Sequence, residues 1–88
     1  MGAILIVDDD PRLRQSFEKL LAAEGHTVWT APDGETALGQ VKANSPDMVI
    51  MDIRMPGMGG LDTFKAMHQI DPKLPVIKIG RASCRERV

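Results

Sequence analysis

Unbroken apolar runs recur along the chain and are separated by segments with helical periodicity. Residues 3–7 and 48–51 are aliphatic or methionine throughout, a pattern typical of strands that are covered on both faces of a parallel sheet. Residues 27–31 are predicted to form another strand, and a fourth is predicted to begin at Pro75. The pattern therefore predicts four strands.

Three amphipathic helices are predicted between these strands. Asp10 and Pro11 are residue types that favour an N-cap and a first helical position, and the helix they begin is predicted to end at Glu24. The second helix is predicted over residues 35–43, after a Pro-Asp-Gly turn. The first and third helices each have an apolar face: Leu13, Phe17, Leu20 and Leu21 in the first, and Leu61, Phe64, Met67 and Ile70 in the third.

Alternation of strands with single helices favours an α/β fold, in which a parallel sheet with right-handed crossovers carries helices on both faces. Ligands bind to such sheets at the carboxyl ends of the strands. Asp8 and Asp9 follow the first strand directly, and Asp52 follows the third. We therefore expect these three carboxylates to lie at one edge of the sheet.

Composition and charge exclude several classes of partner. The chain has 88 residues and a formal net charge of -1, so its charge does not favour direct contact with nucleic acid or an anionic membrane. Its apolar runs are far shorter than the roughly 20 residues that cross a bilayer. The single cysteine, Cys84, cannot form an intrachain disulfide, and the N-terminus has no secretion-signal pattern, so we expect a cytoplasmic protein.

The three carboxylates are costly to bring together unless a cation compensates their mutual repulsion. Mg²⁺ prefers oxygen ligands and commonly takes carboxylates together with phosphate oxygens and waters. A carboxylate that attacks a phosphoryl group needs such a cation beside it. The acidic set therefore indicates a nucleophile, Asp52, next to a metal site formed with Asp8 and Asp9.

Three motifs carry a resemblance to a known family: IVDDD at residues 6–10, MDIRMPG at 51–57 and GGL at 59–61. At this spacing they resemble the receiver domain of bacterial two-component response regulators, over about residues 4–77. The resemblance implies a flavodoxin-like parallel sheet with helices on both faces and strand order 2-1-3-4-5. With four predicted strands and three helices, this chain would hold an incomplete version of that fold.

The resemblance also implies a role for each site residue. Asp52 would be the phosphoacceptor, Asp9 a direct Mg²⁺ ligand, and Asp8 an assisting ligand that acts partly through water. Asp52 itself and the backbone carbonyl of Arg54 would complete the protein's share of the metal ligands. Asp10 has either a metal role or a helix-capping role, and its place before a proline favours the cap.

In this family the phosphoryl group comes from a partner histidine kinase, a phosphotransfer protein or a small phosphodonor. The resemblance therefore implies a phosphorelay module that transfers the group to itself and is not a turnover enzyme. An aspartyl-phosphate phosphatase would need a second acid two residues after the nucleophile, where this chain has Arg54. The full-length protein is expected to carry an output domain that regulates transcription, and a homodimer of it is compatible with the resemblance.

The end of the chain departs from the family pattern. Receiver domains have Thr or Ser at the end of the fourth strand, where this chain has Gly80, and Ser83 is three residues late. The fifth strand with its lysine has no counterpart here. Residues 79–88 resemble the translation of a sequencing adapter, so we expect residues 1–78 to be a partial receiver domain and 79–88 a non-native tail. Gly80, if native, favours the alternative of a receiver-like interaction module that is not phosphorylated.

Several other polar or aromatic side chains are predicted to have structural roles only. His26 is expected to face solvent in a turn, because no second ligand lies at metal spacing from it. Trp29 is predicted to make an apolar contact, and Lys65 and Lys73 are predicted to be solvated.

Overall fold

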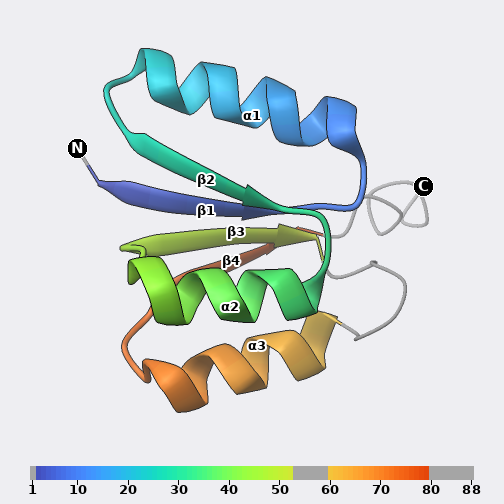
Figure 1. The fold of residues 1–88 in the computed structure, drawn as a ribbon, viewed down its shortest axis with the longest axis vertical. Coiled ribbons are helices and arrows are strands. Elements are labelled where there is room, and N and C mark those ends of the chain that lie inside the picture. Colours follow the sequence, from blue (N-terminus) through green and yellow to red (C-terminus); the bar gives the residue numbers. More distant parts are fainter. Residues whose placement is uncertain (1, 53–59, 80–88) are drawn as a thin grey trace, which may run out of the picture.

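The computed structural model describes residues 2–52 and 60–79 of the chain. Strands and helices alternate in the described part: β1 (Ala3–Val7), α1 (Pro11–Ala23), β2 (Thr27–Ala31), α2 (Gly34–Asn44), β3 (Met48–Asp52), α3 (Gly60–Ile70) and β4 (Val76–Ile79). The strands are all parallel and form one sheet in the order β2-β1-β3-β4 (Figure 1). The predicted α/β fold is confirmed, and the order of these strands agrees with the flavodoxin-like pattern.

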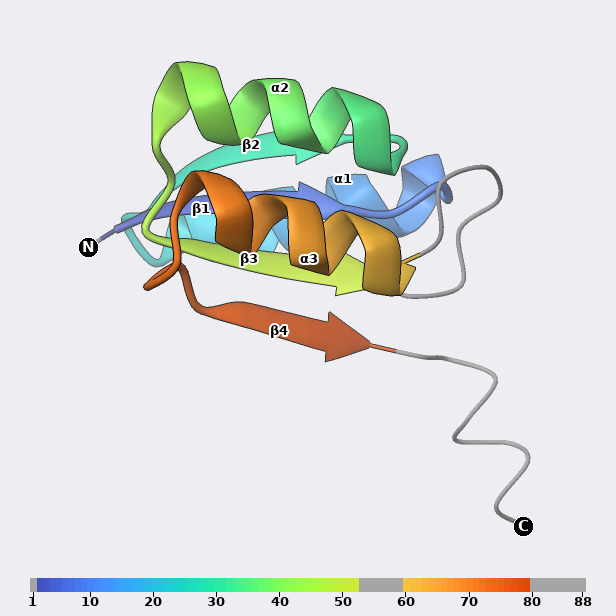
Figure 2. The same ribbon diagram turned by 90° about the horizontal axis from the view of Figure 1, so that it is seen from below.

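The sheet is covered unequally on its two faces. Helices α2 and α3 lie side by side on one face, and α1 lies on the other (Figure 2). The main core is enclosed between the sheet and the α2/α3 pair, and its fully or nearly fully buried members are Leu5, Val7, Ala31, Ala37, Val41, Val49, Met51, Met67 and Leu74. Trp29 packs against this core, which confirms its predicted apolar role.

Strand β1 is aliphatic because it is central and buried on both faces. Its residues Leu5 and Val7 face α2, while Ile4 and Ile6 are buried on the other face. This is the environment that an unbroken apolar run predicts. Strand β4, by contrast, is at the end of the sheet, and its Ile77 is 49% exposed.

The apolar face predicted for α1 is wrong at Leu20, which is 61% exposed. Leu13, Phe17 and Leu21 are half-buried, and the helix contacts β1 and β2. Leu20 stays in solvent because no other described helix lies beside α1 on this face of the sheet (Figure 2). Helical periodicity identified a hydrophobic stripe, but the described partners cover only part of it.

The apolar face predicted for α3 is also shifted. Leu61 is 60% exposed and Ile70 is 38% exposed, whereas Thr63 and Met67 are fully buried. The helix packs this face against α2, and a Cβ atom added at Gly34 would overlap the Thr63 hydroxyl. At this close approach, α2 and α3 are therefore in contact through Gly34 and Thr63, and not through the aliphatic side chains that the sequence pattern predicts.

The prediction that His26 faces solvent is wrong. Its ring is half-buried, and Nδ1 accepts a hydrogen bond from the Gly2 backbone N–H at 3.1 Å. The turn that carries it uses Gly25 at φ 96°, and it brings the ring against the start of β1. The second amide of this region, that of Ala3, donates to Asp47 Oδ2 at 2.8 Å. Both contacts fix the amino-terminal end of the sheet.

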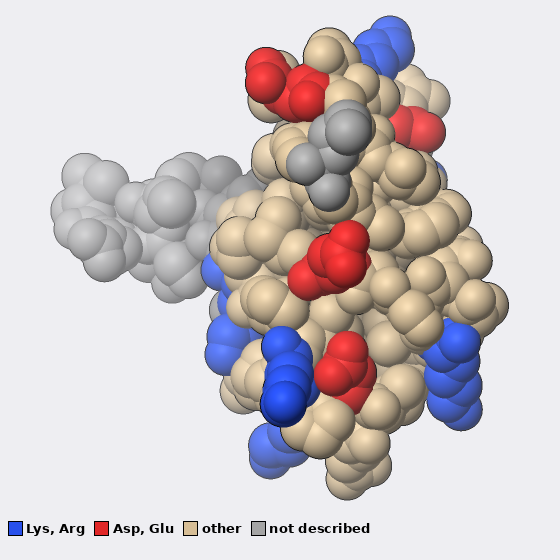
Figure 3. Space-filling view, turned by 90° about the vertical axis from the view of Figure 1, so that its left-hand side faces the viewer, with Lys and Arg blue, Asp and Glu red and all other residues tan. Residues whose placement is uncertain are grey.

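Figure 3 shows the molecule from the side where the N-terminus lies. Acidic and basic side chains sit there in separate small groups and form no continuous patch of one sign. Lys65 and Lys73 are exposed, as predicted. Among the described helices, none is long and apolar enough to cross a membrane.

Candidate metal centre

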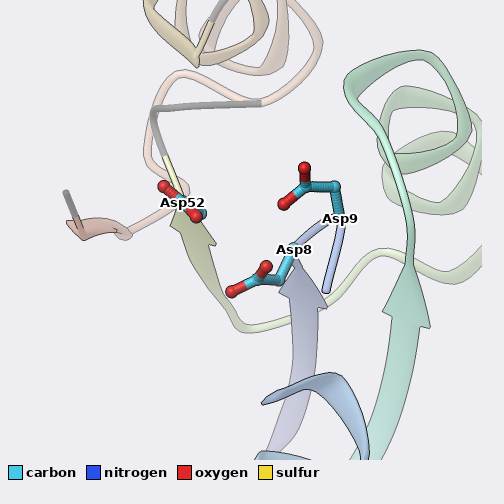
Figure 4. A group of neighbouring side chains, drawn as sticks. All are labelled: Asp8, Asp9 and Asp52. Atoms are coloured by element: carbon cyan, nitrogen blue, oxygen red, sulfur yellow. The ribbon is translucent and has the colours of Figure 1, made fainter. Parts of the chain in front are cut away.

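Strand pairing brings the three predicted carboxylates together at one edge of the sheet. Strands β1 and β3 are parallel neighbours with Val7 opposite Met51, so the residues that follow, Asp8 and Asp52, are adjacent. Asp9 is one residue further along the β1–α1 loop. Oxygens of the three side chains lie within 4.8 Å of one another, and the carboxylates of Asp8 and Asp9 extend toward the tip of β3 (Figure 4).

The three side chains differ in their contact with solvent. Asp52 is 2% exposed and Asp8 is 6% exposed, whereas Asp9 is exposed. Burial of charged groups is costly unless hydrogen bonds or a counter-charge compensate. The site therefore consists of two buried carboxylates at the sheet edge and a third that is exposed to solvent.

The β1–α1 loop is held by a short series of hydrogen bonds. The Asp8 N–H donates to the Ala31 carbonyl at 3.1 Å and so extends the pairing of β1 with β2 beyond the strand. Asp8 Oδ1 accepts from the Asp10 N–H at 2.9 Å. Asp10 Oδ1 in turn accepts from the Arg12 N–H at 2.9 Å and caps α1. The predicted capping role of Asp10 is confirmed.

Sequence reasoning missed Arg14, which also contacts this loop. Its guanidinium Nη1 donates to the Asp8 backbone carbonyl at 2.8 Å, and the side chain is half-buried. A weak signal was present in the sequence. The positive end of the helix macrodipole favours acids near the start of a helix, but α1 has no acid in its first turn and has Arg12 and Arg14 close by. A basic residue there needs another partner.

The donor set fits a magnesium ion. Mg²⁺ holds its oxygen ligands at about 2.0 to 2.1 Å in an octahedron, so two direct ligands lie roughly 3.0 to 4.2 Å apart. The carboxylate oxygens lie within 4.8 Å of one another, which is close to that range. A carboxylate that binds the ion through a water can lie further from the other ligands. The remaining predicted ligand, the carbonyl of Arg54, and the residues Gly80 and Ser83 lie outside the described part of the chain.

A parallel sheet of this order with an acidic cluster at its carboxyl edge is the arrangement that the resemblance to receiver domains implies. The model of the response regulator receiver domain family matches residues 4–87. The chain belongs to this family and is a receiver domain of the two-component response regulators.

Relatives in sequence include a transcriptional regulator and a response regulator, both much longer than this chain. It is 42% identical over 76 residues to the DNA-binding transcriptional regulator NtrC of Salmonella typhimurium. The matched region is 86% of this chain and 16% of NtrC. It is 37% identical over 86 residues to the response regulator MprA of a Mycobacterium species. That matched region is 97% of this chain and 37% of MprA. The chain thus spans well under half the length of these two relatives.

Solved structures with this fold include the chemotaxis protein CheY4 of Vibrio cholerae. That chain superposes with a TM-score of 0.85 at 32% identity, over 89% of this chain and 67% of CheY4. A chain from the complex of histidine kinase ThkA with response regulator protein TrrA superposes with a TM-score of 0.83 at 35% identity, over 91% of this chain and 69% of its own length. The likeness extends over both the sheet and its helices.

Proposed function

We propose that this receiver domain accepts a phosphoryl group on Asp52, from a histidine kinase or a small phosphodonor, with Mg²⁺ bound beside it. The observation that supports the proposal most strongly is the convergence of Asp8, Asp9 and Asp52 from two neighbouring strands to within 4.8 Å. A nucleophile and its metal ligands have to meet in this way, and acids that merely cap helices have no reason to.

The chemical step is a single displacement at phosphorus. A carboxylate oxygen of Asp52 forms the new bond to phosphorus, and the bond from phosphorus to the donor breaks. The electron pair of that bond leaves with the donor, which is a histidine ring nitrogen or the oxygen of an acyl phosphate. Because Asp52 is only 2% exposed, the donor has a narrow range of approach and water has little access to the acyl phosphate that forms.

Asp8 and Asp9 would hold the metal ion, with Asp52 and the Arg54 carbonyl as further ligands. When bound, Mg²⁺ supplies positive charge next to the oxygens of the transferring group. Asp8 is restrained by the Asp10 N–H on one of its carboxylate oxygens, so it meets the ion from a fixed direction. Asp9 is exposed and meets it from the solvent side.

The proposal extends to partners and setting. The solved ThkA–TrrA complex supports a histidine kinase as the donor, since one of its chains shares this fold. The likeness to the DNA-binding transcriptional regulator NtrC supports a transcription-regulating output domain in the full-length protein, and hence a cytoplasmic location. The domain itself takes up one phosphoryl group and is not a turnover enzyme.

Intact-mass spectrometry tests this function. The chain is incubated with acetyl phosphate, in the presence of Mg²⁺ or of EDTA. The same incubations are done with a longer chain in which the receiver domain is completed to the length of CheY4. We expect one acid-stable, base-labile phosphoryl group that requires Mg²⁺, is lost in Asp52→Asn and is retained in Asp62→Asn, a variant of an exposed acid on α3. Absence of the modification from both chains would refute the proposal and favour an interaction module that is not phosphorylated.

A further inference from the structure

The loop that carries Asp8 and Asp9 has two kinds of restraint. Hydrogen bonds of the Asp8 N–H and of the Asp8 side chain fix where β1 ends and how the chain turns toward α1. Neither bond involves the Asp8 carbonyl oxygen. That oxygen accepts a hydrogen bond from Arg14 Nη1 at 2.8 Å.

Arg14 joins the start of α1 to the end of β1 at two points. Its backbone N–H donates to the Asp10 carbonyl at 3.1 Å as part of the helix, and its guanidinium donates to the Asp8 carbonyl. A hydrogen bond from a charged donor is stronger than one between neutral groups. The half-buried position of Arg14 reduces competition from water for the same oxygen.

The planarity of the peptide group extends this restraint to Asp9. The Asp8 carbonyl and the Asp9 N–H belong to one rigid trans unit and point in opposite directions. When Arg14 holds the carbonyl oxygen, it also restrains the peptide plane that contains the N and Cα of Asp9, and so limits the directions open to the Asp9 side chain. Asp9 is exposed, so close packing restrains its side chain less than that of the buried Asp8.

The geometry points to Arg14 as a positioning residue of the acidic site: by holding the Asp8 carbonyl, it sets the direction in which Asp9 presents its carboxylate to the metal ion. This inference rests on the proposed metal site and deepens it. Arg14 would thus assist cation binding through its hydrogen bond, although its positive charge alone would repel a cation.

Charge and positioning predict opposite effects of removing the side chain. If Arg14 acted only through its positive charge, its removal would reduce repulsion and tighten Mg²⁺ binding. If it positions Asp9, its removal weakens binding, as loss of partners that orient metal ligands commonly does. Arg12 offers a matched control, because it is on the same helix, carries the same charge and is exposed.

Nuclear magnetic resonance on the whole chain gives two readouts, one of them without metal. In the metal-free protein we expect Arg14→Met to shift the Asp8 carbonyl carbon and the Asp9 amide signals, and Arg12→Met to leave both unchanged. In a Mg²⁺ titration we expect the dissociation constant to rise roughly tenfold in Arg14→Met. Arg12→Met should stay within about twofold of wild type, because solvent screens its charge.

Arg14→Lys keeps the charge and separates the two explanations further. Lysine presents one point charge on a flexible stem instead of a planar fork, so we expect intermediate shifts at Asp9 and a Mg²⁺ dissociation constant about threefold above wild type. Wild-type values in both readouts for Arg14→Lys, or unchanged or tighter Mg²⁺ binding in a folded Arg14→Met, would overturn the inference. If Arg14→Met does not fold, the result for Arg14→Lys decides.

Failure of this inference is distinguishable from failure of the proposed function. A wild-type chain that binds no Mg²⁺ contradicts the proposed function, while the metal-free signals of Asp9 still test the role of Arg14. Normal phosphorylation and Mg²⁺ affinity in Arg14→Met contradict only the role of Arg14.

Discussion

Asp8 combines two properties that oppose each other in the metal-free protein. Its carboxylate is 6% exposed and accepts the Asp10 N–H, which orders the loop, but it lies close to the carboxylates of Asp9 and Asp52. Like charges at this range disfavour the folded state, and a bound cation would offset their repulsion. If the proposed metal site is real, its acids are kept at the expense of stability, a common compromise in proteins.

Asp8→Asn should separate these two properties. Asparagine keeps a side-chain oxygen for the Asp10 N–H and removes one negative charge. We expect the free energy of unfolding without metal to rise by about 1 kcal/mol, and the stabilisation that added Mg²⁺ provides to fall. Urea unfolding with and without Mg²⁺ measures both quantities. Equal stabilisation by Mg²⁺ in wild type and variant would mean that Asp8 does not contribute to the metal site.

Asp33 makes a separate, pH-dependent contribution at the start of α2. Hydrogen bonds from the backbone N–H and the side chain of Thr36 lower the pKa of Asp33 from its ordinary value of 3.8. Its contribution to stability is therefore complete above pH 3.8 and is lost as the pH falls through the lowered pKa. Asp33→Asn keeps an N-cap that does not titrate.

We expect the unfolding free energy of wild type to fall relative to that of Asp33→Asn as the pH decreases below about 4. The two proteins should differ by a constant amount near neutral pH, where Asp33 is ionised in both the folded and the unfolded chain. Chemical unfolding at a series of pH values measures the difference. A difference that does not change with pH would show that Thr36 does not favour the ionised cap.

Individual site residues differed in how far they could be predicted. The proximity of Asp8, Asp9 and Asp52 was predictable, because Asp8 and Asp52 directly follow apolar runs, Asp9 follows Asp8, and parallel strands place such positions at one edge. Arg14 was missed because its partner is a backbone carbonyl six residues away, which no pattern of residue types encodes. His26 was misjudged because its partner, Gly2, comes from a distant part of the sequence.

At the scale of elements, the contact between α2 and α3 depends on one glycine. A Cβ atom at Gly34 would overlap the hydroxyl of the buried Thr63, whereas a Cβ atom at Gly39, on the same helix, would meet nothing within 4 Å. The contact lies at the starts of both helices, near the carboxyl edge of the sheet.

These two glycines form a matched pair for mutation. Gly34→Ala should lower the unfolding free energy by about 1 to 3 kcal/mol, because the core must shift to admit the methyl group. Gly39→Ala should raise it by about 0.5 to 1 kcal/mol, because alanine favours an exposed helix position. Urea unfolding measures both. Adding Thr63→Ala to Gly34→Ala should recover part of the loss, and purely additive effects would argue against the overlap as the cause.

The existence and order of the elements along the chain were predictable, and their packed faces were less so. An unbroken aliphatic run such as residues 3–7 has few alternatives to a buried strand. For α1 and α3, periodicity identified the correct side approximately, but Leu20 and Leu61 are exposed because burial depends on which neighbours cover that side. Strand order came from the family resemblance, since the alternating pattern does not encode it.

At the scale of the whole molecule, β4 is the end strand of the described sheet. Within the described residues, β4 pairs with β3 on one side, and its Ile77 is 49% exposed. Leu20 of α1 is also exposed, on a face where α1 is the sole described helix. Unpaired strand edges with exposed apolar residues favour association between chains.

Ile77→Lys should reduce that association without removing the core, because Ile77 is outside the main buried cluster. We expect less light scattering at equal concentration and a larger monomer fraction in size-exclusion chromatography, since charge on an edge strand opposes pairing. Lys65→Ile provides the opposite control on an exposed position of α3. A wild-type chain that stays monomeric at every concentration tested would contradict a role of the exposed Ile77 in association.

Localisation of the phosphoryl group tests the central claim most directly. After incubation with acetyl phosphate and Mg²⁺, the chain is reduced with borohydride, which converts an aspartyl phosphate to homoserine, and is then digested and sequenced by mass spectrometry. We expect conversion at Asp52 alone, and none when Mg²⁺ is withheld. Conversion at Asp8, Asp9 or any other acid, with Asp52 unmodified, would contradict it.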